Sequence, residues 1–428
     1  MLADSSIVTL ALPDILVEFD STVLGISWVL TAFNLVFALA LLPAAILARR
    51  VPGPTWAIGL VVFALASAAC AVAATGGFLI GARCVQAIGG AAVVSGAIEL
   101  LARTTGTHQA AARLWGTAGL AGLALGPALG GILTEALSWE SIFYVQAPLI
   151  LLVPLALRAP GPAERGAGGK IEPQPEIALA LLSAGLTGAI FLLVVMLTEG
   201  WRYSPLEAAA VVTAMPIATV IAGTFASRLG TGPPVLAAGA IAIATGLAAL
   251  GILPGADWWW VIGPQILVGA GIALSLPGLT DRALGGRDPA GRRASGTIAA
   301  RHVGVVVGIV VLTPVFDSQL QVEYDDVQRS GTALLLDAPL SPGTKIDLGE
   351  AIGEEVAAAD GALPSLTPAF TSIEPESGQD ETYAELKTDL EDEIDAAATH
   401  AFSPAFLAAA AIALLALVPI GASARRRA

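Results

Sequence analysis

Residues 176–197 read EIALALLSAGLTGAIFLLVVML, and Glu176 is the only charged residue in this run of 22. A helix of about 20 apolar residues spans a bilayer, because it rises about 1.5 Å per residue and the hydrocarbon core is about 30 Å thick. Comparable runs recur along the chain, and we predict eleven full-length membrane spans. They lie at residues 26–48, 55–75, 79–101, 111–135, 142–157, 176–197, 206–227, 235–253, 259–280, 294–316 and 402–422. The predicted fold class is therefore an all-α polytopic membrane protein.

The composition agrees with this fold class. Of the 428 residues, 55% are hydrophobic and 13% are charged, and the mean hydropathy is +0.77. A soluble globular protein carries about 25% charged residues, and a disordered chain combines low hydrophobicity with high charge. Both classes are excluded.

A twelfth apolar run, Ser5–Leu16, opens the sequence but is too short to span a bilayer. It lacks the basic start and the small-residue cleavage site of a signal peptide. We expect a first helix that is truncated at its N-terminus, and a natural gene product that begins about 10–15 residues earlier.

The net charge of −14 comes from one segment. Residues 320–400 hold 19 of the 35 acidic residues and only three of the 21 basic ones. No basic run of the kind that binds nucleic-acid phosphates is present, so we expect no nucleic-acid partner. Cys70 and Cys84 lie in apolar runs, and two such thiols indicate neither a disulfide framework nor a metal site. We expect no metal and no cofactor.

Basic residues orient the predicted spans. With the chain start in the cytoplasm, the inner loops hold 15 basic residues and the short outer loops hold only Arg202, as the positive-inside rule requires. Residues 158–175, rich in Gly, Pro and charge, are predicted as a cytoplasmic linker. This linker divides an N-terminal six-helix half, 1–157, from a C-terminal six-helix half, 176–428, which includes an acidic extracellular loop at 317–401.

We expect most of the acidic segment to be loop. One amphipathic helix is predicted before the last span, because Tyr383, Leu386, Leu390 and Ile394 recur at helical spacing. Two interpretations of the segment stay open: a solvated acidic spacer, or a surface that raises the local cation concentration.

Five stretches carry a family resemblance. They are ADSSIVTLALP at 3–13, GARCVQAIGGA at 81–91, GLALGPALGG at 122–131, SWESIFYVQAP at 138–148, and RASG at 293–296 with RHVG at 301–304. In this order they resemble LDxTIVNVALP, RxxQGxGA, GxxxGPxxGG, WRWIFxINxP and ASG…RQxG, the motifs of drug:proton antiporters in the major facilitator superfamily. The resemblance covers nearly the whole chain and points to the multidrug efflux branch.

Two departures from the family pattern concern gating and substrate class. The loop after the second helix reads AILARRVPGP at 45–54 where the family has GxLADRxGRR, so Arg49 stands in place of the gating aspartate. The multidrug branch usually has two extra central helices, and this chain has no room for them.

The resemblance implies a twelve-helix secondary transporter of the cytoplasmic membrane that exports small amphipathic compounds in exchange for protons. Its partners would be a small-molecule substrate, protons and the lipid bilayer, and we expect a monomer. Two alternatives remain: an importer or exchanger of an endogenous metabolite, or a non-transporting membrane protein whose acidic outer segment binds a partner. No phosphate-binding loop of the GxxxxGK[ST] type and no catalytic arrangement occurs, so we expect no enzyme.

Three residues are candidates for proton coupling. Arg83 lies within a predicted span, and Asp4 would lie within the membrane once the first helix is complete. Ionisable groups there are costly unless they are paired, hydrated or protonated, so both residues are functional candidates. Arg301 matches the late motif. Gln86, one turn after Arg83, and His302 are candidates for contacts with substrate in the cavity. The alternative for Asp4 is an exposed or frayed residue near the start of the sequence, and for Arg83 it is a structural arginine whose head group extends to the membrane interface. Gln86 could instead bind a neighbouring helix, and His302 could serve packing or hydrogen bonding.

The glycine motif at 122–131 predicts a smooth helix face. Gly122, Gly126 and Gly130 recur every four residues, with Gly131 beside them, and Pro127 bends the helix. We interpret this face as close helix packing. Glu99, Glu135 and Glu199 lie near predicted helix ends and are expected to be solvated.

Overall fold

The computed structural model describes residues 2–105, 108–156, 173–284, 292–358, 366–373, 375 and 379–425. The ordered elements in these ranges are all helical, which confirms the predicted class. Nine of the described helices are long and apolar enough to cross a membrane. Large apolar side chains such as Leu39, Ile58 and Leu65 are exposed on the outside of the bundle, as expected for surfaces that face lipid.

We call the helices from α1 to α7 the N-terminal half; they comprise five long helices and one broken crossing. The long helices are α1 Leu2–Glu18, α2 Val23–Arg50, α3 Pro52–Ala71, α4 Gly76–Thr104 and α5 His108–Ala136. The sixth crossing is divided into α6 Ser141–Tyr144, the 3-10 helix η1 Ala147–Leu152 and α7 Val153–Ala156. Pro148 and Pro154 lack the amide hydrogens that a continuous helix needs, which explains the break.

We call the helices from α8 onward the C-terminal half; α8 begins at Pro173, inside the predicted linker. Residues 158–172 of that linker lie outside the described ranges. The helices are α8 Pro173–Val195 with the π-helical turn η2 Met196–Gly200, α9 Pro205–Val212, α10 Ala214–Leu229, α11 Pro233–Leu250, α12 Trp258–Leu284, α13 Arg292–Asp337, α14 Pro342–Ala358, α15 Thr367–Ser372, α16 Asp380–Leu415 and α17 Leu417–Arg425.

Local signals fix several helix starts. Thr22 and Thr75 accept hydrogen bonds from backbone amides of the first turns of α2 and α4. Ser204 and Glu207 form a reciprocal capping box at the start of α9. Pro52 and Pro233 occupy first-turn positions, where a missing amide hydrogen costs nothing.

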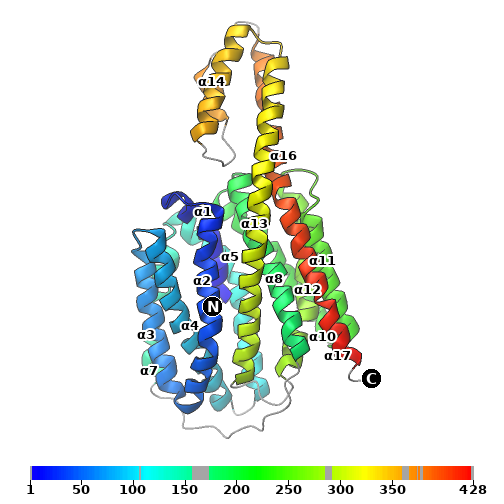
Figure 1. The fold of residues 1–428 in the computed structure, drawn as a ribbon. Helices are drawn as coiled ribbons and strands as arrows, with labels where there is room; N and C mark the ends of the chain where they lie inside the picture. Colours follow the sequence, from blue (N-terminus) through cyan, green and yellow to red (C-terminus); the bar gives the residue numbers. More distant parts are fainter. Residues whose placement is uncertain are drawn as a thin grey trace.

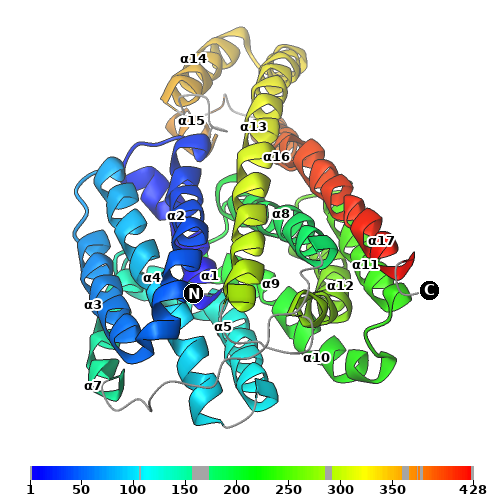
Figure 2. The ribbon, with the colours of Figure 1, turned by 60° about the horizontal axis from the view of Figure 1, so that its bottom comes forward.

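The two halves meet along two lines. On one side α2 packs against α13, and on the other α5 packs against α9 (Figures 1 and 2). Within the C-terminal half, α13 lies directly on α8, because a Cβ atom at Gly304 or Gly308 would collide with the carbonyl oxygen of Ala180 or Ala184. Small residues let membrane helices approach this closely.

The acidic segment is folded, so the expectation that most of it is loop was wrong. Helix α13 has 46 residues and α16 has 36, and both continue beyond the bundle (Figure 1). There they pack with α14 and α15 around a separate core. This core comprises Leu340, Leu348, Leu366, Ala369, Phe370, Tyr383, Leu386, Leu390 and Ile394. We call residues 320–400 the acidic subdomain. The predicted amphipathic helix is confirmed within α16, with all four of its apolar positions buried.

Candidate functional site

Arg83 and Gln86 lie one turn apart on α4, and both side chains are fully buried. The Arg83 Nη1 donates a hydrogen bond to Gln86 Oε1 over 2.5 Å. The guanidinium also lies over the ring of Phe33 on α2, 4.0 Å from its centroid, which is a cation–π contact. A charge removed from water is stable only with such partners, so this part of the bundle is organised around the arginine.

Two further side chains orient Gln86. Its Nε2 donates to Ser67 Oγ on α3 over 2.7 Å and to Gln146 Oε1 over 3.1 Å. The Ser67 hydroxyl donates to the Phe63 carbonyl, and Gln146 Nε2 donates to the Ile142 carbonyl. Both groups therefore act as acceptors for Gln86, and its carboxamide oxygen has to face the guanidinium.

A row of rings on α2 links this network to the other half. Phe33 and Phe37 stack with their centroids 5.8 Å apart, and the Phe37 ring lies 4.5 Å from the His302 ring on α13. His302 Nδ1 lies 2.6 Å from Asn34 Oδ1 on α2. The row runs from Arg83 to His302 and crosses the interface between the halves.

For the other two candidates for proton coupling, the structure gives the position in the chain but fewer contacts. Arg301 lies on α13 directly before His302. Asp4 lies in α1, but its side chain is outside the described part of the chain. The geometry therefore brings Arg83, Gln86 and His302 into one connected row and leaves the contacts of Asp4 undefined.

The glycine motif lies where α5 approaches two other helices. A Cβ at Gly130 would lie 3.0 Å from the Cα of Ile7 on α1, and one at Gly131 would lie 2.5 Å from the Cβ of Ala209 on α9. Gly126 and Pro127 are buried, and Gly122 is half-buried. The Gly131 contact joins the two halves, so a side chain there would push them apart.

Glu99 is not solvated, contrary to expectation. It accepts a hydrogen bond from Arg103 one turn later on α4 at 3.2 Å, and the side chains of Glu99 and Arg103 are 11% and 4% exposed. The i,i+4 spacing lets these two charges pair on the same helix face. Glu135 and Glu199 are exposed, in agreement with the expectation.

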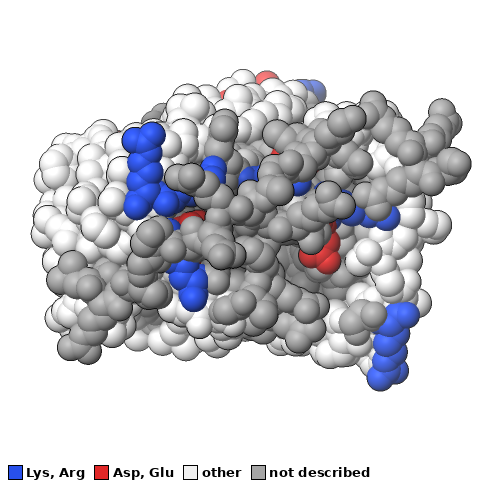
Figure 3. Space-filling model, turned by 90° about the horizontal axis from the view of Figure 1, so that it is seen from below, with Lys and Arg blue, Asp and Glu red and all other residues white. Residues whose placement is uncertain are grey.

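The end of the bundle opposite the acidic subdomain is rich in arginine. Figure 3 views this end, where arginine side chains stand on the surface. Residues at the ends of α2, α10 and α12 and in the first turn of α13 contribute: Arg49, Arg50, Arg228, Arg282 and Arg293. The two ends of the molecule therefore carry opposite charge.

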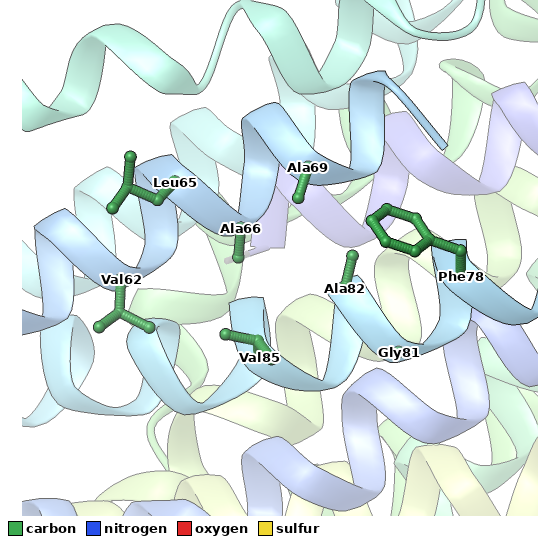
Figure 4. Close-up of a pocket in the computed structure, with 8 residues that line it drawn as sticks. All are labelled: Val62, Leu65, Ala66, Ala69, Phe78, Gly81, Ala82 and Val85. Atoms are coloured by element: carbon green, nitrogen blue, oxygen red, sulfur yellow. The ribbon is translucent and has the colours of Figure 1, made fainter. Parts of the chain in front are cut away.

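A hollow of about 540 Å³ lies between α3 and α4 (Figure 4). Its lining is entirely apolar: Val62, Leu65, Ala66, Ala69, Phe78, Gly81, Ala82 and Val85. A site that recognises a polar compound needs placed polar groups, so this hollow does not provide one. Within the described ranges, no group of three or more His, Cys, Asp or Glu residues is arranged to hold a metal ion.

Sequence reasoning missed Phe33, Asn34, Phe37, Ser67 and Gln146. Two signals were present. Asn34 is the only amide side chain in the predicted span 26–48, and Gln146 occupies the asparagine position of the INxP motif. The remaining three are ordinary residues of apolar spans, and only their neighbours reveal a role.

Comparison with known proteins defines the class. The family model of the Major Facilitator Superfamily matches residues 1–312, and the chain belongs to this superfamily. It is a multi-pass membrane protein of a transporter family and not an enzyme. The family match ends before the acidic subdomain begins.

Curated relatives match a part of the chain. The methylenomycin A resistance protein of Bacillus subtilis (strain 168) is 34% identical over 171 residues, which are 38% of this chain and 37% of that protein. The multidrug resistance protein Stp of Mycobacterium tuberculosis (strain CDC 1551 / Oshkosh) is 36% identical over 154 residues, 35% of this chain and 29% of that protein. The chain thus matches these relatives over about a third of their length.

Solved structures support the fold. A bacterial homolog of the human lysosomal transporter Spinster, in an inward-facing and unoccupied conformation, aligns with a TM-score of 0.63 over 98% of this chain and 95% of that one, at 15% identity. A D-xylose–proton symporter aligns with a TM-score of 0.56 over 72% and 85% of the two chains, at 13% identity. At these identities the likeness concerns the fold alone.

Proposed function

We propose that this protein is a proton-coupled secondary transporter that exports small amphipathic compounds by alternating access. The observation that carries the proposal is the buried Arg83, held by Gln86 and Phe33 within the membrane-spanning bundle. Drug-resistance relatives support the export of toxic compounds, and the two packed halves provide the elements that would rock against each other.

The proposed coupling uses Asp4, Arg83 and Arg301. A carboxylate in the bilayer favours its neutral form, whereas an arginine stays charged and attracts an acid. Release of the Asp4 proton to one side would leave a negative charge for which a cationic substrate can compete. Gln86 and His302 would contribute polar contacts to the substrate cavity between the halves.

The proposed topology places the arginine-rich end in the cytoplasm and the acidic subdomain outside the cell. It rests on the charge asymmetry between the two ends and on the positive-inside rule. The functional units are the N-terminal half 1–157, the cytoplasmic linker 158–175 and the C-terminal half 176–428.

A transport assay tests the proposal. A resistance profile, obtained by expressing the chain in a strain that lacks efflux pumps, selects the compound. Vesicles that contain the purified protein and have an acidic interior should then accumulate this compound against its gradient, because each proton that leaves drives the compound in the opposite direction. Asp4→Asn should abolish this pH-driven accumulation and preserve binding of the compound. Transport in the same direction as the protons would instead support the importer, and undiminished accumulation by Asp4→Asn would remove Asp4 as the coupling group.

A further inference from the structure

Asn34 is a buried amide at the interface between the halves, where it is 2% exposed. Its Nδ2 donates a hydrogen bond to the Leu30 carbonyl on its own helix over 2.8 Å. The carboxamide oxygen therefore points away from that carbonyl, and it lies 2.6 Å from His302 Nδ1 on α13.

This geometry selects one form of His302. A carboxamide oxygen only accepts hydrogen bonds, so the Nδ1 atom of His302 has to carry the hydrogen. In the neutral ring Nε2 is then the atom with the free lone pair. The hydrogen bond to Asn34 is present whether or not Nε2 is protonated.

The contact joins helices that have to separate. Helix α2 belongs to the N-terminal half and α13 to the C-terminal half, and below the contact Phe37 and Leu41 pack in one cluster with Ala294 and Ile298. Alternating access moves one half relative to the other. A polar bond buried at such an interface favours the arrangement in which it is formed.

We propose that the Asn34–His302 hydrogen bond is a latch between the two halves, with Asn34 as the positioning residue. The inference deepens the proposed transport function and rests on it for its role in the cycle. Asn34 holds the imidazole against Phe37 with Nδ1 protonated, and separation of α13 from α2 breaks the bond. Arg301 directly precedes His302 on α13, and Arg83 lies beyond the two phenylalanine rings. On α8, Glu176 lies beside Gly296 of α13.

A distance measurement tests the latch without requiring transport. Spin labels on cysteines at Arg50 of α2 and Asp281 of α12, both exposed, report the separation of the halves when Cys70 and Cys84 are replaced by alanine. Interhelical hydrogen bonds in membranes stabilise by amounts that correspond to about a 3- to 18-fold change in population. Asn34→Leu should shift the two-state population by this factor toward the wider separation.

Three variants make the result specific. Asn34→Asp retains an acceptor oxygen and should keep the original distribution. His302→Phe removes the bond from the other side and should produce the same shift as Asn34→Leu, with no further shift when both are combined. Thr31→Val removes a different buried polar group, a hydroxyl one turn earlier on α2, and should leave the distribution unchanged.

Transport kinetics provide the second measurement. Asn34→Leu should change kcat by several-fold, because the latch affects the conformational step. Distance distributions of Asn34→Leu and His302→Phe that match the unmodified protein would overturn the latch. Absence of transport by the unmodified protein would instead contradict the proposed function, and the distance measurement would still decide on the latch.

Discussion

The membrane bundle and the acidic subdomain share α13 and α16, but the bundle is surrounded by lipid and the acidic subdomain by water. In the bundle the exposed side chains are apolar, such as Leu39 and Leu415, and a charged side chain, Arg83, is buried. In the acidic subdomain acids such as Asp326 and Glu381 are exposed, and leucines such as Leu348 and Leu386 are buried in its core. The same helix thus reverses its pattern between lipid and water.

The difference shows where function can reside. The acidic subdomain has the ordinary construction of a soluble domain, in which apolar burial drives folding. The bundle gains little from burying apolar side chains, because lipid is equally apolar, so packing of small residues and polar contacts decides its arrangement. The buried row from Gln146 to His302 is therefore the informative part of the bundle.

The largest expected effect concerns the side of the membrane on which the acidic subdomain lies, because labelling of a cysteine from outside the cell is all or none. A cysteine at Ser372 in α15 should react with a membrane-impermeant thiol reagent added to intact cells. A matched cysteine at Arg50, at the arginine-rich end, should react only after lysis. The reverse pattern would place the acidic subdomain in the cytoplasm and contradict the proposed topology.

Removal of the acidic subdomain should leave the bundle intact. The two regions have separate cores, and the family match ends at residue 312. With residues 324–394 of the subdomain replaced by a short, flexible Gly/Ser linker, the protein should insert, purify as one species and retain its thermal transition. Aggregation or loss of membrane insertion would show that the subdomain supports the bundle.

A core substitution in the acidic subdomain should have a smaller and local effect. Leu386→Ala removes a buried side chain of that core and should destabilise the subdomain by about 2–5 kcal/mol. Leu415→Ala, on the lipid-facing side of the same helix, should cost far less. Hydrogen exchange of α14 and α16 measures both, and equal exchange in the two variants would refute the separate core.

The sequence predicted the membrane helices well because the length of an apolar run is set by bilayer thickness. The sixth crossing differs from its prediction as one full-length span at 142–157, because Pro148 and Pro154 interrupt it. The acidic subdomain was misjudged because its core residues, such as Leu348 and Phe370, are sparse among acids, alanines and prolines. Its apolar face forms only when four helices meet.

Within the site, the sequence identified residues in motifs but not their partners on other helices. Arg83, Gln86 and His302 stood in recognisable motifs, whereas Asn34 and Ser67 belong to other helices and are paired only in three dimensions. Glu99 was misjudged for a related reason, since its position near a helix end indicated water and its pairing with Arg103 was overlooked.

In the proposed mechanism the Arg83 network couples transport to protons. The direct test is pH-driven accumulation in vesicles by Arg83→Lys, which keeps the charge but loses the planar donor group, with Arg103→Lys on the same helix as the matched control. We predict that Arg83→Lys lowers pH-driven accumulation by at least about tenfold, or about 1.4 kcal/mol, and that substrate exchange without a gradient persists in both variants. Arg103→Lys should accumulate as the unmodified protein does. Full pH-driven accumulation by Arg83→Lys would contradict the claim.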